Sequence, residues 1–404
     1  MLAIWVQGLY NGIKKKGGVE MKKWLAVFLC MAALTLVGCA EQVVQPEEST
    51  SRPVETTVPV VTEPPVTEPE IVTDELRAQW DALAEKCQFQ GVLYLTHNGK
   101  EVYRYISGMD DQGEPLTLES PLYMSSVSKQ FCAAAIVMLR DQGQLDLDDP
   151  LEKYFPEYTV GRDITLRQLL TMRSGIVRDF APVLQEPHRF EQMSPQQVSD
   201  AMLRWLYEQE LVFSPGTDFA YSNVNYTLLS YVVEQVSGEH YEDFVQQHIF
   251  GPLGMIHSDF INQVAENPHW GLTYGKLLRG SWLGDLLQGC GDIISTAQDM
   301  DIWMTALRSG KVVCEESYRE MTTDYSDGAM ESSLYGYGLV GSIRDGWGHG
   351  GNNEDYTSWI YFNEAYGYNY FLATPNTPET MRNQHKIMTS EFLRLLFAAE
   401  DAAQ

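Results

Sequence analysis

The sequence predicts an α/β protein of the α+β kind, in which helices flank one antiparallel β-sheet that carries a mainly helical insertion. Two strand-like runs lie near residue 100, and aromatic-rich runs of period two return beyond Leu334. Between them the apolar residues follow helical spacing. Strands at both ends of a helical middle favour a single sheet that both ends of the chain complete, with helices on its faces.

The elements follow in order along the chain. The first strand pair is joined by Asn98-Gly99, a dipeptide typical of a two-residue hairpin turn. Gly143 and Gly238 are positioned to end helices, and Ser295–Asp299 is typical of a capping box. We expect helices over 79–85, 126–142, 165–172 and 225–237, another after the 295–299 segment and one over 379–398, and strands over 91–96, 101–106, 335–342, 347–350, 358–362 and 368–373. The stretch 176–213 is expected to be irregular, with short helical pieces.

Residues 1–39 read as a secretory signal. Met21-Lys22-Lys23 gives a basic start, and an apolar core from Trp24 to Val37 follows it that is too short for a comfortable bilayer span. Met21 is therefore a better start than Met1. The core ends at Leu36-Val37-Gly38-Cys39, which resembles the lipobox of bacterial lipoproteins, in which the cysteine carries diacylglycerol. The resemblance implies an extracytoplasmic protein held at the cell membrane through lipid on Cys39.

Residues 40–73 are rich in Pro, Thr, Val and Glu, and such a segment cannot bury a core. We expect a stalk that reaches up to about 100 Å from the membrane. The folded domain then spans 74–404. The first 39 residues carry a formal charge of +4 and the stalk −6, so the domain retains −25 of the total of −27. No Lys/Arg-rich block interrupts this acidity, which argues against a nucleic-acid partner.

Neither a metal nor a cofactor is expected. The histidines show no HExxH-like spacing, and none pairs with cysteine at zinc-site spacing. An exported setting permits disulfides among Cys87, Cys132, Cys290 and Cys314, but the sequence does not choose among the three pairings.

Ser126 and Lys129 are the first candidates for chemistry. They lie three residues apart at the start of an apolar helix, so they share a helix face, and the ammonium can take the hydroxyl proton or stabilise its anion. The helix N-terminus adds N–H donors and partial positive charge. Such a tetrapeptide also occurs by chance about once in a chain of this length, so it carries weight only with further signals.

Two further signals meet the needs of acyl transfer by serine. Tyr221-Ser222-Asn223 places a phenol and an amide two residues apart on a loop, and Gly348-His349-Gly350-Gly351 offers glycines where a backbone approaches a ligand. Tyr361-Phe362-Asn363, His97-Asn98-Gly99 and His269-Trp270-Gly271 fit the same short patterns. We set Tyr361 aside because it lies in the middle of an expected strand, and His97 because it adjoins the hairpin turn. His269 is harder to exclude, and only the absence of a preceding strand argues against it.

Taken in order, Ser126/Lys129, Tyr221/Asn223 and His349/Gly351 resemble the three motifs of the β-lactamase-related serine hydrolases, a family of class C β-lactamases, D-alanyl-D-alanine carboxypeptidases, D-amino-acid peptidases and esterases. The resemblance covers about residues 80–398. It extends to the segments Thr165–Thr171, Phe213–Gly216, Gly251–Met255 and Gly291–Asp299. It implies the β-lactamase/transpeptidase-like fold.

The resemblance also implies a role for each residue. Ser126 would be the nucleophile, and Lys129 would ease proton loss from Ser126 and Tyr221. Tyr221 would be the general base on acylation, although it would titrate together with Lys129 and the base could be assigned to either. Asn223 would donate to the substrate, and the backbone N–H groups of Ser126 and Asn352 would form the oxyanion hole.

The third motif departs from the Lys-Thr-Gly of true β-lactamases, because His349 replaces the lysine and Gly350 the threonine. A neutral imidazole and a glycine hold a substrate carboxylate poorly. We therefore expect a hydrolase of small D-amino-acid peptides, amides or esters rather than of β-lactams, acting on substrates that include cell-wall-derived ones. The alternative is a penicillin-binding or peptidoglycan sensor module of the same fold that acylates but does not turn over.

Overall fold

A computed structural model describes residues 71–110, 113–182, 189–190, 192–266, 281–330, 333–342, 344, 346–352, 356–375 and 379–403. The predicted signal with its lipobox at Cys39, all but the last three residues of the stalk, and His269 lie outside this part of the chain. Within it, the predicted α/β class with an antiparallel sheet and flanking helices is confirmed.

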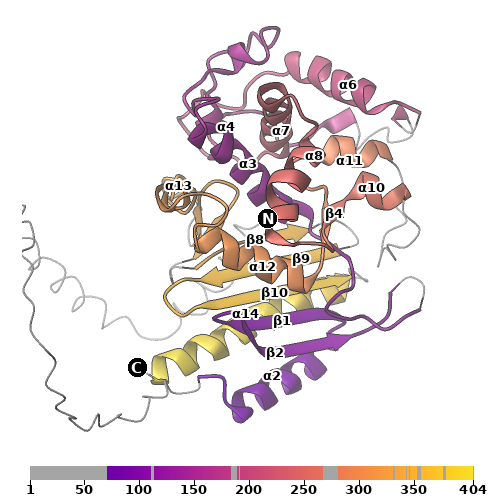
Figure 1. Ribbon diagram of the computed structural model, residues 1–404, viewed down its shortest axis with the longest axis vertical. Coiled ribbons are helices and arrows are strands. Elements are labelled where there is room, and N and C mark those ends of the chain that lie inside the picture. Colours follow the sequence, from indigo (N-terminus) through magenta and orange to yellow (C-terminus); the bar gives the residue numbers. More distant parts are fainter. Residues whose placement is uncertain are drawn as a thin grey trace, which may run out of the picture. The chain divides into compact units, whose positions relative to one another are not determined.

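Figure 1 labels the elements in chain order. The strands are β1 (Gly91–His97), β2 (Lys100–Ser107), β3 (Leu122–Tyr123), β4 (Asp259–Phe260), β5 (Ile293–Ser295), β6 (Ser333–Tyr335), β7 (Val340–Ser342), β8 (Gly346–Asn352), β9 (Tyr356–Asn363) and β10 (Tyr368–Pro375). The α-helices are α2 (Asp74–Lys86), α3 (Lys129–Asp141), α4 (Leu166–Leu170), α6 (Pro195–Tyr207), α7 (Asn223–Ser237), α8 (Tyr241–Val245), α9 (Gly251–Leu253), α10 (Ile261–Glu266), α11 (Ser281–Leu287), α12 (Ala297–Arg308), α13 (Glu315–Met321) and α14 (Glu379–Ala403). Short helical turns cover Ser125–Ser128 (η1), Leu151–Lys153 (η2) and Gln246–Phe250 (η4).

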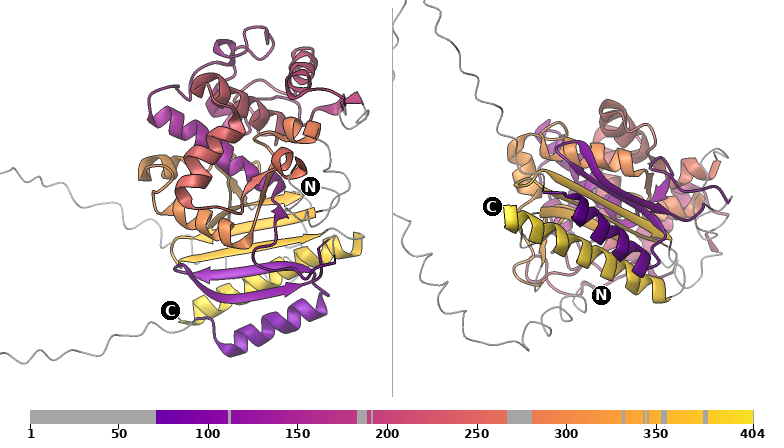
Figure 2. Two further views of the ribbon diagram at one scale, coloured as in Figure 1. Left: turned by 45° about the vertical axis from the view of Figure 1, so that its right-hand side comes forward. Right: turned by 90° about the horizontal axis from the view of Figure 1, so that it is seen from below.

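The main sheet has seven antiparallel strands in the order β2-β1-β10-β9-β8-β7-β6. The N-terminal hairpin pairs with the last strand, because β1 lies beside β10, so both ends of the domain complete one sheet as predicted. Helices α2 and α14 lie side by side on one face, and α12 crosses the other (Figures 1 and 2). The helices between β3 and β5 gather beyond that second face.

Each face of the sheet has its own apolar core. Trp80 of α2 is fully buried, stacks on Phe392 of α14 with ring centroids 4.2 Å apart, and donates its indole N–H to the Phe392 carbonyl. The larger core lies on the opposite side, around α3 and α7. Phe131 of α3 stacks there on Trp303 of α12 with ring centroids 4.0 Å apart, and Trp303 donates its indole N–H to Gln130 Oε1 at 3.0 Å, so the start of α3 packs against α12.

Local signals placed most element boundaries correctly. Asn98 and Gly99 both have positive φ, as a two-residue hairpin turn requires. Thr165 caps α4 and Thr296 caps α12 through their side-chain oxygens, and Gly238 ends α7 with a left-handed φ of 77°.

Several elements differ from the prediction, and a second sheet was not predicted. Helix α2 begins at Asp74 rather than at 79, α14 runs to Ala403 rather than to 398, and the stretch 176–213, expected to be irregular, contains the regular helix α6. The expected strand over 335–342 is two strands, because Gly336–Leu339 turns back between β6 and β7, with Gly338 at φ 67°. Helix α3 begins at Lys129, and Ser126 lies in the tighter turn η1 before it. The second sheet, β3-β5-β4, has only two or three residues per strand, too few to show a period in the sequence.

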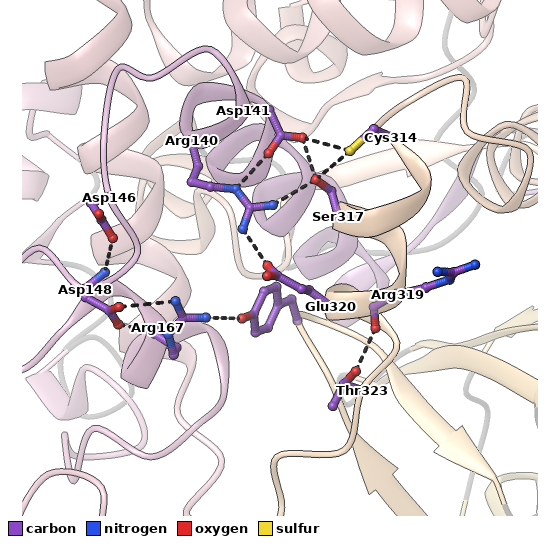
Figure 3. A network of polar contacts seen from close by, with 11 residues as sticks. Arg140, Asp141, Asp146, Asp148, Arg167, Cys314, Ser317, Arg319, Glu320 and Thr323 are labelled. Carbon is purple, nitrogen blue, oxygen red and sulfur yellow. Dashed lines mark hydrogen bonds and ion pairs between the residues drawn. The ribbon is translucent and has the colours of Figure 1, made fainter. Parts of the chain in front are cut away.

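The C-terminal end of α3 is tied to α13 by polar contacts (Figure 3). Arg140 of α3 bonds Asp141 beside it and reaches Ser317 and Glu320 of α13. Nearby, Arg167 of α4 pairs with Asp148 and donates to the buried Tyr337 hydroxyl at 2.8 Å. The Arg140 bonds therefore attach the C-terminal end of α3 to α13, while Lys129 lies at the other end of this helix.

Within the described ranges, no helix is long and apolar enough to cross a membrane, and no group of three or more His, Cys, Asp or Glu side chains is placed to hold a metal ion. The four cysteines whose disulfide pairing the sequence did not decide are free thiols in the structure. Cys87, Cys132 and Cys290 are buried, and Cys314 is exposed.

Candidate active site

The nucleophile candidate lies on a turn that both sheets hold in place. Ser125, directly before Ser126, has a φ of 49°, which is uncommon for a residue with a side chain and costs about 1–3 kcal/mol. The Met124 N–H donates to the Ile293 carbonyl of the small sheet at 3.0 Å. The Met124 carbonyl accepts from Ser358 of the main sheet at 2.7 Å. The turn therefore keeps its strained conformation because it is fastened on two sides.

Lys129 lies beneath this turn and is fully buried. Its Nζ is 3.2 Å from Ser126 Oγ, 2.8 Å from Asn223 Oδ1 and 2.6 Å from the Cys290 carbonyl oxygen. The last two atoms can only accept, so two of the Nζ protons are committed to them. The remaining position faces Ser126, where an ammonium donates to the hydroxyl oxygen and an amine accepts its proton.

Asn223 is the first residue of α7, and its amide links two groups. Its Oδ1 accepts from Lys129, while its Nδ2 donates to Asp179 Oδ1 at 2.7 Å. Ser222 caps α7 before it and donates its hydroxyl to the Val177 carbonyl at 2.8 Å. We expected the Asn223 side-chain amide to donate to a substrate. One of the two hydrogens on its Nδ2 is already donated to Asp179 within the protein.

Two basic side chains approach the ring of Tyr221. The Lys129 Nζ is 5.0 Å from its ring centroid and the Arg178 guanidinium is 5.2 Å from it, distances at which each cation is attracted to an aromatic ring. Its hydroxyl is buried without a hydrogen-bond partner among the described residues. A proton acceptor poised for a substrate or for Ser126 is expected to be unsatisfied in this way before the substrate arrives.

The third motif lies on β8. His349 is buried, with its ring centroid 6.1 Å from that of Tyr221. Its Nδ1 lies 2.7 Å from the Gly350 carbonyl, which can only accept, so the ring proton is on Nδ1 and Nε2 carries the lone pair. Nε2 is buried and has no partner in the described structure. Burial and the nearby Lys129 lower the pKa of His349 to about 3, so this imidazole is neutral.

Gly351 lets β8 approach the nucleophile turn. A Cβ at this position would lie 2.2 Å from the Met124 carbonyl oxygen and 2.3 Å from Ser358 Oγ. Strand β8 pairs with β7 only at Gly348 and Trp347, so from His349 onward its other edge faces η1. Asn352 is the last residue of β8 and pairs with Thr357 of β9. The placement is compatible with the predicted oxyanion hole, and that role of Asn352 stays a prediction.

The structure thus brings Ser126, Lys129, Tyr221, Asn223, His349 and Gly351 to one place from three segments of the chain. It also shows contributors that the sequence analysis missed: Asp179 and Arg178 on the loop after α4, and the Cys290 carbonyl. Tyr335 is a further one, since its buried ring meets Tyr221 at 6.2 Å and His349 at 6.4 Å. The aromatic and glycine residues of Tyr335-Gly336-Tyr337-Gly338 could have pointed to Tyr335. The Cys290 carbonyl could not have been found in this way, because a backbone atom leaves no pattern in the sequence.

Comparison with known proteins agrees with this geometry. The family model described as Beta-lactamase matches residues 76–386. A putative penicillin-binding protein, PbpX, of Bacillus subtilis is 32% identical over 261 residues, which are 62% of each chain. Penicillin-binding protein 4* of the same organism is 29% identical, covering 45% of this chain and 40% of its own. The chain therefore spans about three fifths or less of the length of these relatives.

Solved structures show the same fold. The D-amino acid amidase of Ochrobactrum anthropi, determined with L-phenylalanine, superposes with a TM-score of 0.67 at 22% identity, over 82% of this chain and 99% of that one. The octameric penicillin-binding protein homologue of Pyrococcus abyssi superposes with a TM-score of 0.65 at 24% identity, over 80% and 78%.

Proposed function

Because the chain belongs to the beta-lactamase family, we propose that it is a serine hydrolase that forms an acyl-enzyme on Ser126. The single observation that carries the proposal is the 3.2 Å contact between Ser126 Oγ and the fully buried Nζ of Lys129. A buried amine at this distance stabilises the alkoxide or accepts its proton, and either role activates the hydroxyl.

The reaction runs in two steps. Ser126 Oγ attacks the acyl carbon while its proton passes to the Lys129–Tyr221 pair, and the same pair returns a proton to the departing amine or alcohol. Water then attacks the acyl-enzyme, and its proton restores Ser126. In both steps the carbonyl oxygen becomes negative, and backbone N–H groups of η1 and the end of β8 stabilise it. Each such donor is worth ~10²–10³ in rate.

The third motif favours substrates that donate a hydrogen bond over substrates that carry a carboxylate. The neutral His349 presents a lone pair on Nε2, which complements an N–H or O–H group and repels a carboxylate. A side chain at 350 would meet the Trp359 ring, since a Cβ there lies 2.4 Å from it, so a threonine hydroxyl has no room. The acidic chain also disfavours anionic substrates. We therefore propose small D-amino-acid amides, peptides or esters as substrates.

A fluorophosphonate probe and a small substrate panel test the proposal. Wild type is expected to be labelled and to hydrolyse D-amino-acid amides or nitrophenyl esters faster than nitrocefin, and Ser126→Ala is expected to do neither. Ser199→Ala is the matched control, because that hydroxyl lies on α6 and donates to the Pro195 carbonyl of its own helix. Equal labelling of wild type and Ser126→Ala would refute the nucleophile. Labelling by penicillin that never decays, with no substrate hydrolysed, would instead identify a sensor.

We also propose that the protein is exported and held at the extracytoplasmic face of the membrane by lipid on Cys39. The support is the Leu36–Cys39 segment after a basic start and an apolar core. The full chain expressed in a bacterium and fed a labelled fatty acid is expected to incorporate it. Cys39→Ser is expected to abolish incorporation, and Cys30→Ser, within the apolar core, is expected to keep it.

A further inference from the structure

The charge on Lys129 has no immediate counter-charge. Its three hydrogen-bond partners are a hydroxyl, an amide oxygen and a backbone carbonyl, none of which is formally charged. A fully buried ammonium is costly unless a negative charge lies close enough to balance it.

The ionisable groups packed around Lys129 do not supply that charge. Burial lowers the pKa of His349 on β8 to about 3 and raises that of the Cys290 thiol to about 11. Burial also raises the pKa of Cys132 on α3, Tyr226 on α7 and Asp292 before β5. Each of these groups is therefore pushed toward its uncharged form.

Asp179 is a carboxylate that reaches Lys129 through one amide. Asn223 donates from Nδ2 to Asp179 Oδ1 at 2.7 Å and accepts at Oδ1 from Lys129 at 2.8 Å. A carboxylate can only accept and an ammonium can only donate, so the two ends together determine which way the amide points. The aligned amide dipole connects the negative group to the positive one.

We propose that Asp179 is the counter-charge of Lys129, acting through the side chain of Asn223, and is thereby a positioning residue for the reaction at Ser126. This inference rests on the proposed function of Ser126 and Lys129. Asp179 touches no reacting atom; it orients the amide and favours the charged state of the Lys129–Tyr221 pair.

The loop that carries Asp179 is fastened where this role needs it. The Asn223 N–H donates to the Arg178 carbonyl at 2.8 Å, and the Ser222 hydroxyl donates to the Val177 carbonyl at 2.8 Å. Arg178 Nε contacts the other carboxylate oxygen of Asp179 at 3.2 Å, and its guanidinium lies against Tyr221. The positive Arg178, which is exposed, therefore contacts the negative Asp179, and Asp179 is linked through the Asn223 amide to the buried Lys129.

Loss of the carboxylate makes nearby protons easier to remove. In Asp179→Asn, both limbs of the pH profile of the acylation rate are expected to move to lower pH, by about half a pH unit to one pH unit. The freed Arg178 charge acts in the same direction. A merely structural role would lower the plateau and leave the limbs in place.

The experiment measures fluorophosphonate labelling rates of the full-length protein from pH 5 to 10. Asp163→Asn is the matched control, because it makes the same charge change at an exposed site and is expected to leave the profile unmoved. Asp179→Glu keeps the charge, and its limbs are expected to stay at the wild-type pH even if its plateau falls. Limbs of Asp179→Asn that superpose on those of wild type would overturn the proposal.

A second measurement separates this inference from the proposed function. If wild type shows no Ser126-dependent labelling, the proposed function fails, and the inference is then tested on the Lys129 ammonium itself. Its ¹⁵N resonance in lysine-labelled protein is identified by its absence from Lys129→Arg. The titration of this resonance is expected at lower pH in Asp179→Asn than in wild type and Asp163→Asn, and coincident curves would overturn the inference.

Discussion

The close approach of β8 to the nucleophile turn leads to a quantitative prediction for Gly351→Ala. A methyl group at 351 would lie 2.2 Å from the Met124 carbonyl oxygen, 2.3 Å from Ser358 Oγ and 2.9 Å from Ser125 Cβ. Ordinary contact needs about 3.4 Å or more, so strand and turn must separate by roughly 1 Å. The separation also strains the 2.7 Å bond from Ser358 to the Met124 carbonyl.

The expected cost combines two effects. Overpacking costs about 1–3 kcal/mol and the weakened hydrogen bond about 1 kcal/mol, so the free energy of unfolding should fall by about 2–4 kcal/mol. A misplacement of this size between the proposed nucleophile and the proposed oxyanion donors costs on the order of 10²-fold in rate. Activity at 15 °C, where the variant stays folded, should therefore fall far more than the folded fraction does.

The assay is kcat/KM on a nitrophenyl ester, beside urea unfolding followed by tryptophan fluorescence. Gly291→Ala is the matched control: it lies near the same site, yet a Cβ there meets nothing closer than 3.6 Å, so both quantities should stay close to those of wild type. Wild-type kcat/KM in Gly351→Ala would refute the argument that β8 must touch the turn for catalysis.

Three further predictions concern stability. His349 is buried with a pKa near 3, so unfolding takes up a proton between about pH 3 and 6.5. The stabilisation from its burial as a neutral ring is therefore complete above about pH 6.5 and is lost as the pH falls. In urea unfolding, the free energy of unfolding of His349→Gln should fall less steeply over this pH range than that of wild type. Arg140→Ala should lower the free energy of unfolding by about 1–2 kcal/mol, through lost bonds to α13, with kcat/KM unchanged; a loss of activity at full folding would show that the α3–α13 contact reaches the site. Trp80→Ala should cost about 3–5 kcal/mol by opening a cavity between α2 and α14, and a cost below 1 kcal/mol would contradict its place in that core.

The sequence was sufficient where a local signal determines the structure. Asn98-Gly99 predicted the hairpin turn, and the capping residues predicted the starts of α4 and α12. Three short motifs predicted the residues that meet at Ser126. It was insufficient where only tertiary packing decides. Asp179 is one of many acidic residues in the chain, and its role depends on a loop whose position is determined by bonds to Ser222 and Asn223. The Cys290 carbonyl is a backbone atom, which every residue has.

The same reasoning explains why residues so distant in sequence form one site. Ser125 keeps a left-handed φ because Ile293 of the small sheet and Ser358 of the main sheet both bind Met124, directly before it. Ile293 also donates its N–H to Ser128 Oγ at 3.0 Å, so the small sheet is hydrogen-bonded to both ends of the turn, at Met124 and at Ser128. The strain of about 1–3 kcal/mol is held only while both sheets are intact. Geometry at Ser126 is therefore coupled to the completed sheet, which needs the N-terminal hairpin and β10 together.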